Sequence, residues 1–154
     1  MKKGQLIKYS FGSELMNITV KYGEEDFSFN LYAETTVDEN TINREIQEQP
    51  SAYAFLGMLH KKLIRKAVDK KREMEKTYSD VYIKAKERID ENTGRPTAQE
   101  LAKEKANAST RYQKAIMIYH DAQHEADIIE VCVRSFEQRQ SLIQTLSANI
   151  RKTS

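Results

Sequence analysis

Apolar residues recur at regular steps through the last third of the chain, and this repeat limits the fold more than any other feature. Steps of four and three residues lead from Leu101 to Ile143, and eleven of the thirteen positions are apolar or tyrosine. A period of 3.5 residues held for about six heptads is typical of a coiled-coil helix, because it keeps one narrow stripe against a partner. The sequence therefore predicts one long helix here. The positions are Leu101, Lys105, Ala108, Tyr112, Ala115, Tyr119, Ala122, Ala126, Ile129, Val133, Phe136, Gln140 and Ile143.

A second long helix is predicted upstream of this repeat. Asp38 or Asn40 could cap a short helix that ends before Pro50, because proline stops propagation. Ser51 is then a favourable N-cap, and apolar residues recur at gaps of mostly three, four and seven as far as Ile89, which indicates a helical stripe over about 40 residues. The stripe consists of Leu56, Leu59, Leu63, Ala67, Met74, Tyr78, Val81, Ala85 and Ile89.

A turn is predicted between the two helices. Gly94 suits a left-handed helix terminator, and Pro96 prevents direct continuation. Thr97 and Glu100 follow with the spacing of a capping box. We therefore expect the second helix to fold back antiparallel on the first, as a two-helix coiled-coil hairpin over residues 51–152.

The first part of the chain has a different pattern. Residues 6–11, 15–22 and 27–33 are short runs rich in β-branched and aromatic residues, and the last two alternate with a period of two, which predicts half-buried strands. We expect a small antiparallel β region at 1–35, an acidic connector at 36–50 and then the helical hairpin. The predicted fold class is α+β, predominantly α.

Residues that support catalysis or metal binding are scarce. The chain has one Cys and five scattered glycines, so an internal disulfide, a zinc cluster and a glycine-rich phosphate loop are not expected. His120 and His124 are four residues apart and could hold a divalent metal on one helix face, but a third ligand is not evident. Cys132 lies between two valines and is interpreted as a small buried hydrophobe. We expect a protein that is not an enzyme and has no cofactor.

The sequence shows no membrane or export signal. Its longest apolar runs are far shorter than the roughly 20 residues of a membrane span. The start, Met1-Lys2-Lys3-Gly4, is not followed by an apolar signal core. We therefore expect a soluble cytoplasmic protein.

Charge is unevenly distributed along the chain. Residues 1–50 hold five Lys and Arg against nine Asp and Glu, whereas residues 51–91 hold eleven against seven. The densest stretch has seven cations and one Asp in twelve residues. On a helix this basic block forms a broad stripe that can follow a phosphate backbone. The predicted nucleic-acid-binding residues are Lys61, Lys62, Arg65, Lys66, Lys70, Lys71 and Arg72. The aromatic residues that could stack on exposed bases are Tyr53, Phe55, Tyr78 and Tyr82.

The apolar stripe of the last helix becomes wider from Ile128 onward. A wider stripe indicates more than one packing neighbour, and the first helix accounts for only one of them. We therefore expect homo-oligomerisation through this end of the chain. The predicted assembly residues are Ile129, Val133, Phe136, Leu142, Ile143, Leu146 and Ile150.

Three features of the helical region occur together: a helix opened by Pro50-Ser51 with a basic block, a turn, and a helix ending in residues 136–146, FEQRQSLIQTL. In this combination, residues 50–152 resemble the phage recombination mediators of the UvsY-like family. The resemblance implies an oligomer, ring-like in that family, that binds single-stranded DNA. It also implies a role in loading a RecA-like recombinase onto DNA covered by single-strand-binding protein. The basic block would then contact phosphates, and residues 129–150 would form the assembly surface.

A second hypothesis remains open. The chain could be a coiled-coil protein-interaction module, such as a phage assembly, structural or inhibitor protein. An open sheet edge or the acidic residues 34–50 would then meet the partner. The basic block would be ordinary solvated surface, as is common on long helices.

Overall fold

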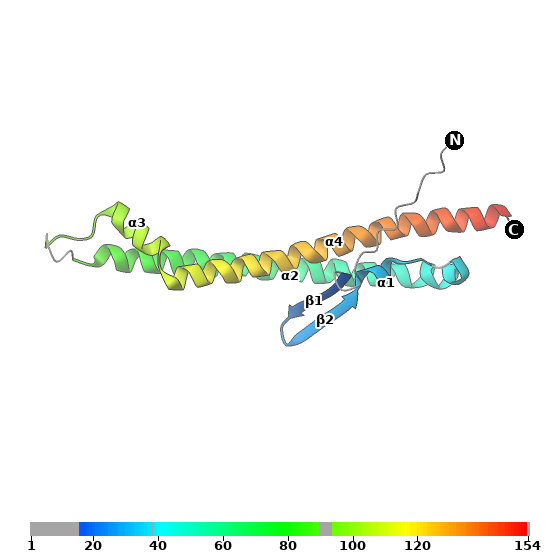
Figure 1. Cartoon of the computed structure of the whole chain (residues 1–154), viewed down its shortest axis with the longest axis horizontal. Helices are drawn as coiled ribbons and strands as arrows, with labels where there is room; N and C mark the ends of the chain where they lie inside the picture. Colours follow the sequence, from blue (N-terminus) through cyan, green and yellow to red (C-terminus); the bar gives the residue numbers. More distant parts are fainter. Residues whose placement is uncertain (1–15, 38, 90–93, 154) are drawn as a thin grey trace, which may run out of the picture. The chain divides into compact units, whose positions relative to one another are not determined.

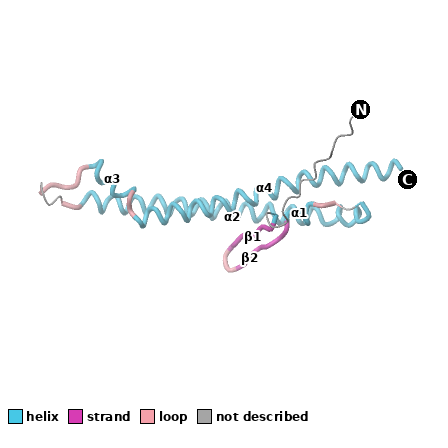
Figure 2. Tube along the Cα trace, in the orientation of Figure 1, coloured by secondary structure: helices cyan, strands magenta, loops and turns pink. Residues whose placement is uncertain are grey.

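The computed structural model describes residues 16–37, 39–89 and 94–153. It is mainly helical with one two-stranded sheet (Figures 1 and 2), which confirms the predicted α+β, predominantly α class. Two compact units are present, and α2 and α4 each run through both. The first unit comprises Met1–Tyr53 and Arg134–Ser154, and the second comprises Ala54–Val133. The elements are β1 (Asn17–Tyr22), β2 (Glu25–Asn30), α1 (Leu31–Thr35), a 3-10 turn (Glu39–Thr41), α2 (Ile42–Glu87), α3 (Gln99–Asn107) and α4 (Thr110–Thr153).

An antiparallel hairpin of β1 and β2 belongs to the first unit. Its two-residue turn begins at Gly23, whose φ of 67° lies in the left-handed region that favours glycine. A type II′ turn needs this conformation at its first central position. Val20 pairs with Phe27 across the sheet and is almost fully buried. The hairpin confirms the strands predicted within residues 15–22 and 27–33.

β2 ends earlier than the sequence predicted. The strand stops at Asn30, and the next five residues form the short helix α1. The Oδ1 of Asn30 accepts a hydrogen bond from the backbone N–H of Ala33 at 2.9 Å, which is the contact of an N-cap. The strand predicted at residues 6–11 lies outside the described residues.

The prediction that the first long helix begins at Ser51 is wrong. α2 begins at Ile42, so most of the predicted acidic connector is helix, and Pro50 lies inside α2. Proline removes one backbone hydrogen bond and costs a helix interior about 3 kcal/mol. Tertiary contacts offset this cost, because Glu45 and Gln49 are buried and both bond to Arg139 of α4.

In the second unit α2 and α4 pack antiparallel, as predicted. Lys66 pairs with Glu125 at 2.5 Å, and farther along α2 the ring of Tyr78 lies 5.1 Å from that of Tyr112. Positions therefore advance on α2 while they recede on α4. The buried α2 residues of this unit all lie on the predicted stripe: Leu56, Leu59, Leu63, Ala67 and Ala85.

The connection after α2 differs from the predicted capping box. α2 ends at Glu87, and Gly94 has a φ of 61°, as a left-handed position requires. Thr97 does not cap the next helix, because both its hydroxyl and its backbone N–H donate to the carbonyl of Arg88, at 2.8 and 2.9 Å. Ala98 occupies the N-cap position and provides no side-chain hydrogen bond.

The second long helix is interrupted, which the continuous repeat did not predict. Ala108 and Ser109 separate α3 from α4. The side-chain amide of Gln113 crosses the interruption and donates to the carbonyl of Asn107 at 2.7 Å. Asn, Ser and Thr crowd this segment, and their side chains compete with helical backbone hydrogen bonds.

The interruption also changes which face of α3 is buried. The 3.5 repeat assigned Leu101 and Lys105 to the interface, but both are exposed. Ala102 and Ala106 are fully buried in their place. The repeat is thus shifted by one residue in α3.

A shift of the same size occurs near the end of α4. Cys132 and Arg139 are buried where the repeat predicted Val133 and Gln140. Arg139 lies in the interface because Glu45 and Gln49 of α2 bond to its guanidinium. The buried positions of α4 are Ala122, Ala126, Ile129, Cys132, Phe136, Arg139 and Ile143.

Candidate nucleic-acid interface

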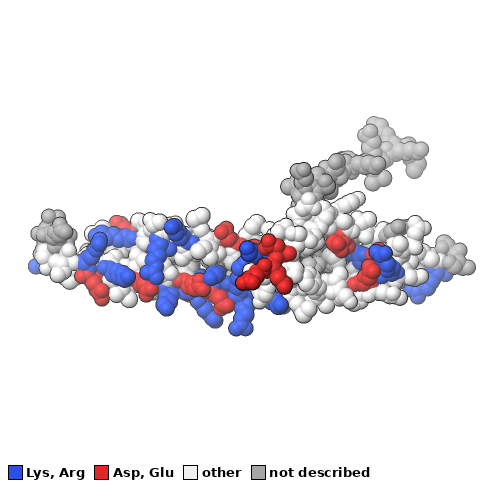
Figure 3. All heavy atoms as spheres, turned by 90° about the horizontal axis from the view of Figure 1, so that it is seen from below, with Lys and Arg blue, Asp and Glu red and all other residues white. Residues whose placement is uncertain are grey.

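The basic block lies on α2 within the second unit, and its seven cations divide by exposure. Lys66 and Lys70 are half-buried, whereas the other five are exposed. Figure 3 shows Lys and Arg side chains gathered over part of one face, with Asp and Glu side chains between them. The exposed members are Lys61, Lys62, Arg65, Lys71 and Arg72.

Helix geometry explains this division. Each residue turns about 100° around the axis, so a row of side chains spaced by four drifts toward one side. The row Lys62, Lys66, Lys70 drifts toward the interface with α4, where Lys66 pairs with Glu125 at 2.5 Å. Lys70 pairs with Glu73 on its own helix at 2.8 Å. The charges of these two lysines are therefore matched within the chain.

A second row faces away from the interface. Lys61, Arg65 and Arg72 lie on the side of α2 opposite Leu63, which is fully buried. Arg72 approaches Asp69 at 3.6 Å, but both side chains are more than half exposed, so solvent weakens this pair. Among the described residues, Lys61 and Arg65 form no ion pair. This outward row is the part of the basic block that can meet a phosphate chain.

The aromatic residues predicted to stack on bases have partners inside the protein. In the second unit, the ring of Tyr78 stacks on that of Tyr82 at 6.2 Å and is tilted against that of Tyr112. In the first unit, the hydroxyl of Tyr53 donates to Glu137 at 2.8 Å, and this bond raises the pKa of Tyr53. Of the four, Phe55 is the most exposed. These aromatics do not form a stacking platform beside the outward row.

The residues considered for metal binding or catalysis do not form a centre. His120 and His124 are exposed, and no group of three or more His, Cys, Asp and Glu in the described ranges could hold a metal ion. Burial raises the pKa of the Cys132 thiol to about 11. The thiol therefore stays protonated at neutral pH, where a protonated thiol is a poor nucleophile.

The predicted assembly residues divide between the core and the surface. Ile129, Phe136 and Ile143 are buried inside the single chain, so they cannot supply an exposed assembly surface. Val133 and Leu146 are half-buried. Leu142 and Ile150 are exposed.

A buried polar layer in the first unit was not predicted. Glu45 and Gln49 of α2 accept hydrogen bonds from the two terminal nitrogens of Arg139, and Gln49 also donates to the carbonyl of Phe136 at 2.7 Å. The hydroxyl of Thr41 donates to Glu45 at 3.3 Å. Gln140, a polar residue within an apolar repeat, was the one sign of this layer in the sequence.

None of the helices in the described part of the chain is long and apolar enough to cross a membrane. Comparison of the chain with protein-family profiles, with curated proteins and with solved structures finds no match.

Proposed function

We propose that this protein is an oligomeric single-stranded-DNA-binding protein of the recombination-mediator kind. The observation that carries the proposal is the outward row Lys61, Arg65 and Arg72, which is exposed on α2 and flanked by exposed Lys62 and Lys71. Cations held along one helix face can replace the counterions of a phosphate chain, and the released counterions supply the binding free energy. The likeness of residues 50–152 to UvsY-like mediators supports the further role of helping a RecA-like recombinase to load.

Binding by this row has a characteristic salt dependence. A single strand loses about 0.7 of a logarithmic unit in affinity per neutralised phosphate for each tenfold rise in salt concentration. The three cations of the outward row therefore predict salt-dependent binding with little preference among bases. Several copies of the row in an oligomer would raise the apparent affinity by multivalency.

Fluorescence anisotropy with a labelled oligo-dT across a salt series tests the proposal. The double variant Lys61→Gln/Arg65→Gln removes the two unpaired cations of the row. It should weaken binding roughly tenfold or more at low salt and flatten the salt slope by about 1.4. The matched control is Lys84→Gln/Lys86→Gln, which makes the same charge change at exposed positions near the end of α2.

Three results would count against DNA binding by this row. The first is undetectable binding of the wild type, the second is binding that does not respond to salt, and the third is an equal loss in both double variants. Sedimentation and circular dichroism of each variant ensure that oligomeric state and helix content are unchanged.

The mediator role needs a separate measurement. A dT strand with a fluorophore at each end, wrapped by single-strand-binding protein, reports by energy transfer whether this protein remodels the wrapped complex. We expect a change in transfer with the wild type and a smaller one with Lys61→Gln/Arg65→Gln. If the energy transfer of the wrapped complex does not change, the protein binds DNA but has no mediator activity.

Exposed apolar side chains favour a second candidate, a protein-interaction module. In the second unit, Met58 and Val68 of α2, and Met117 and Val131 of α4, are each more than two-fifths exposed. Apolar side chains of this size on the surface mark interaction sites when they are contiguous. A single protein partner captured from the native host extract, retained after nuclease treatment and in high salt, would favour this candidate over DNA binding.

A further inference from the structure

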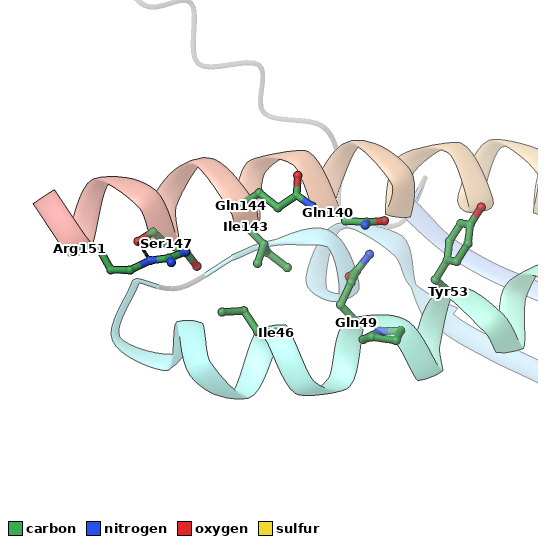
Figure 4. Close-up of a pocket in the computed structure, with 9 residues that line it drawn as sticks. Ile46, Gln49, Tyr53, Gln140, Ile143, Gln144, Ser147 and Arg151 are labelled. Carbon is green, nitrogen blue, oxygen red and sulfur yellow. Dashed lines mark hydrogen bonds between the residues drawn. The ribbon is translucent and has the colours of Figure 1, made fainter.

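An open groove runs between α2 and α4 in the first unit (Figure 4). Its larger part has a volume of about 510 Å³, and an adjoining part of about 250 Å³ shares Ile46, Ser147 and Arg151 with it. The larger part is lined by Ile46 and Pro50 of α2 and by Gln140, Ile143, Ser147 and Arg151 of α4, among others.

The floor of this groove is apolar and follows helical spacing. Ile42 and Ile46 line it from α2, and Ile143 and Ile150 line it from α4. Ile46 is 44% exposed, although it lies between the buried residues Ile42 and Gln49 of its helix. Two antiparallel helices that present apolar side chains over about two turns, roughly 11 Å, form a surface on which a third helix can pack.

One rim of the groove consists of polar side chains that can donate hydrogen bonds, and only that of Arg151 cannot also accept. Gln140, Gln144, Ser147 and Arg151 follow one another along α4 and line the larger hollow. The hydroxyl of Ser147 is buried and has no hydrogen-bond partner in the part of the chain that the structure describes. A buried hydroxyl without a partner costs free energy.

The electrostatics of the groove are one-sided. Arg151 is the one charged residue among the described residues that line it, and no Asp or Glu lines it. The Nε of Arg151 donates to the carbonyl of Ser147 at 3.2 Å, which holds the guanidinium beside the groove. Lys152 follows and is exposed. This end of the groove therefore attracts an acidic group.

We infer that the groove binds an amphipathic helix of a partner protein, with acidic side chains beside its apolar stripe. Apolar residues three and four apart on that helix would contact the isoleucines, and a carboxylate would meet Arg151. The chain's own residues 1–15 have the wrong charge, with Lys2, Lys3 and Lys8 against one Glu. A second copy presenting this face would bring the cationic rims together. The inference concerns a protein contact and does not depend on DNA binding.

Three synthetic peptides of about 18 residues, each labelled with fluorescein, test this inference against the full-length chain by anisotropy. The first has leucines at helical three-four spacing with glutamates beside them. The second replaces the glutamates by lysines, and the third keeps the glutamates but shuffles the leucines. We expect the first to bind at least about tenfold more tightly than either of the others, because only it matches both floor and rim.

Two variants and a control locate the contact. Arg151→Glu should lower affinity for the glutamate peptide and raise it for the lysine peptide, which a merely structural role of Arg151 would not do. Ile46→Gln should weaken both peptides several-fold. Ile83→Gln is the matched control, because Ile83 is an exposed isoleucine of α2 in the second unit, and it should leave both affinities unchanged.

Several outcomes would overturn the inference. They are no binding of the glutamate peptide, equal binding of the glutamate and lysine peptides, and an effect of Ile83→Gln as large as that of Ile46→Gln. A wild-type dimer that Ile46→Gln converts to monomer in sedimentation would assign the groove to a second copy instead. A variant that loses peptide binding but still binds DNA would show that the groove and the basic block are separate sites.

Discussion

At the scale of single residues, Arg139 is the buried charge in the polar layer of the first unit. It is only 8% exposed, and its guanidinium is shared by Glu45 and Gln49. It also lies 5.8 Å from the centre of the Phe136 ring. A buried ion pair of this kind adds little net stability compared with apolar residues, but losing one partner leaves an uncompensated charge in the interior. We infer that the layer specifies which residues of α2 face which residues of α4 in this unit.

The buried layer predicts that losing one partner is more damaging than replacing all of them by apolar residues. Arg139→Ala should lower the free energy of unfolding by about 3 to 5 kcal/mol, because Glu45 and Gln49 are left buried without their donor. Replacing all three residues by leucine should recover most of that loss. Urea denaturation followed by circular dichroism measures both.

The matched control for Arg139 is an arginine in an exposed pair. Arg44 bonds to Glu48 at 3.2 Å, with both side chains more than half exposed. Arg44→Ala should therefore cost less than about 1 kcal/mol. Similar losses at the two arginines, or a triple leucine variant as unstable as Arg139→Ala, would contradict the interpretation of a buried specifying layer.

At the scale of elements, the packing of α3 differs from the packing that the repeat in the sequence predicts. The repeat places Leu101 in the interface, whereas the structure leaves it 40% exposed and buries Ala102 completely. Ala102→Leu should cost about 1 to 3 kcal/mol by overpacking. Leu101→Ala should cost much less than the 2 to 5 kcal/mol of a core truncation.

The same pair of variants tests the assignment in reverse. If the continuous repeat were correct, Leu101→Ala would be the damaging change and Ala102→Leu would be tolerated. Thermal unfolding of the two single variants decides between the alternatives. Helix content at low temperature should remain near the wild-type value in both.

How much of each element could be predicted depended on whether its signal was local. The two paired strands and the left-handed position at Gly94 are properties of short segments, and both were predicted. The start of α2 was missed because contacts with Arg139, far away in the sequence, stabilise a helix through Pro50. The apolar stripe predicted most buried positions of α2. The repeat did not predict the one-residue shifts in α3 and α4.

The two shifts occur on the helices that carry the two polar residues of the otherwise apolar repeat. Lys105 lies in the helix that ends just before the interruption, and Gln140 is next to the buried arginine. Charge patterning placed the basic block on α2, but it could not say which cations turn toward Glu125 and which face outward. The groove in the first unit was not predicted at all, because it depends on how two distant helix ends pack.

At the scale of the whole molecule, the size of the buried side chains divides the second unit. Leucine and isoleucine side chains are buried in one part, from Leu56 to Leu63 on α2 and at Ile129 on α4, where Cys132 is also buried. Beyond these, the buried apolar residues of the unit are all alanines: Ala67, Ala85, Ala102, Ala106, Ala122 and Ala126. Burying a leucine contributes about 1.5 to 3 kcal/mol, whereas a single methyl group contributes about 0.8. The alanine part therefore has less stabilisation per helical turn.

This difference predicts unequal opening along the same two helices. Hydrogen exchange followed by mass spectrometry should show stronger protection at residues 56–63 and 129–136 than at 71–80 and 112–121, where no side chain is fully buried, because amides exchange through local openings whose free energy follows the buried apolar contacts. Leu59→Ala should lower protection in the first two segments and reduce the contrast. Uniform protection across all four segments would mean that α2 and α4 open only as one cooperative structure, and that the segments without a fully buried side chain are as stable as the leucine part.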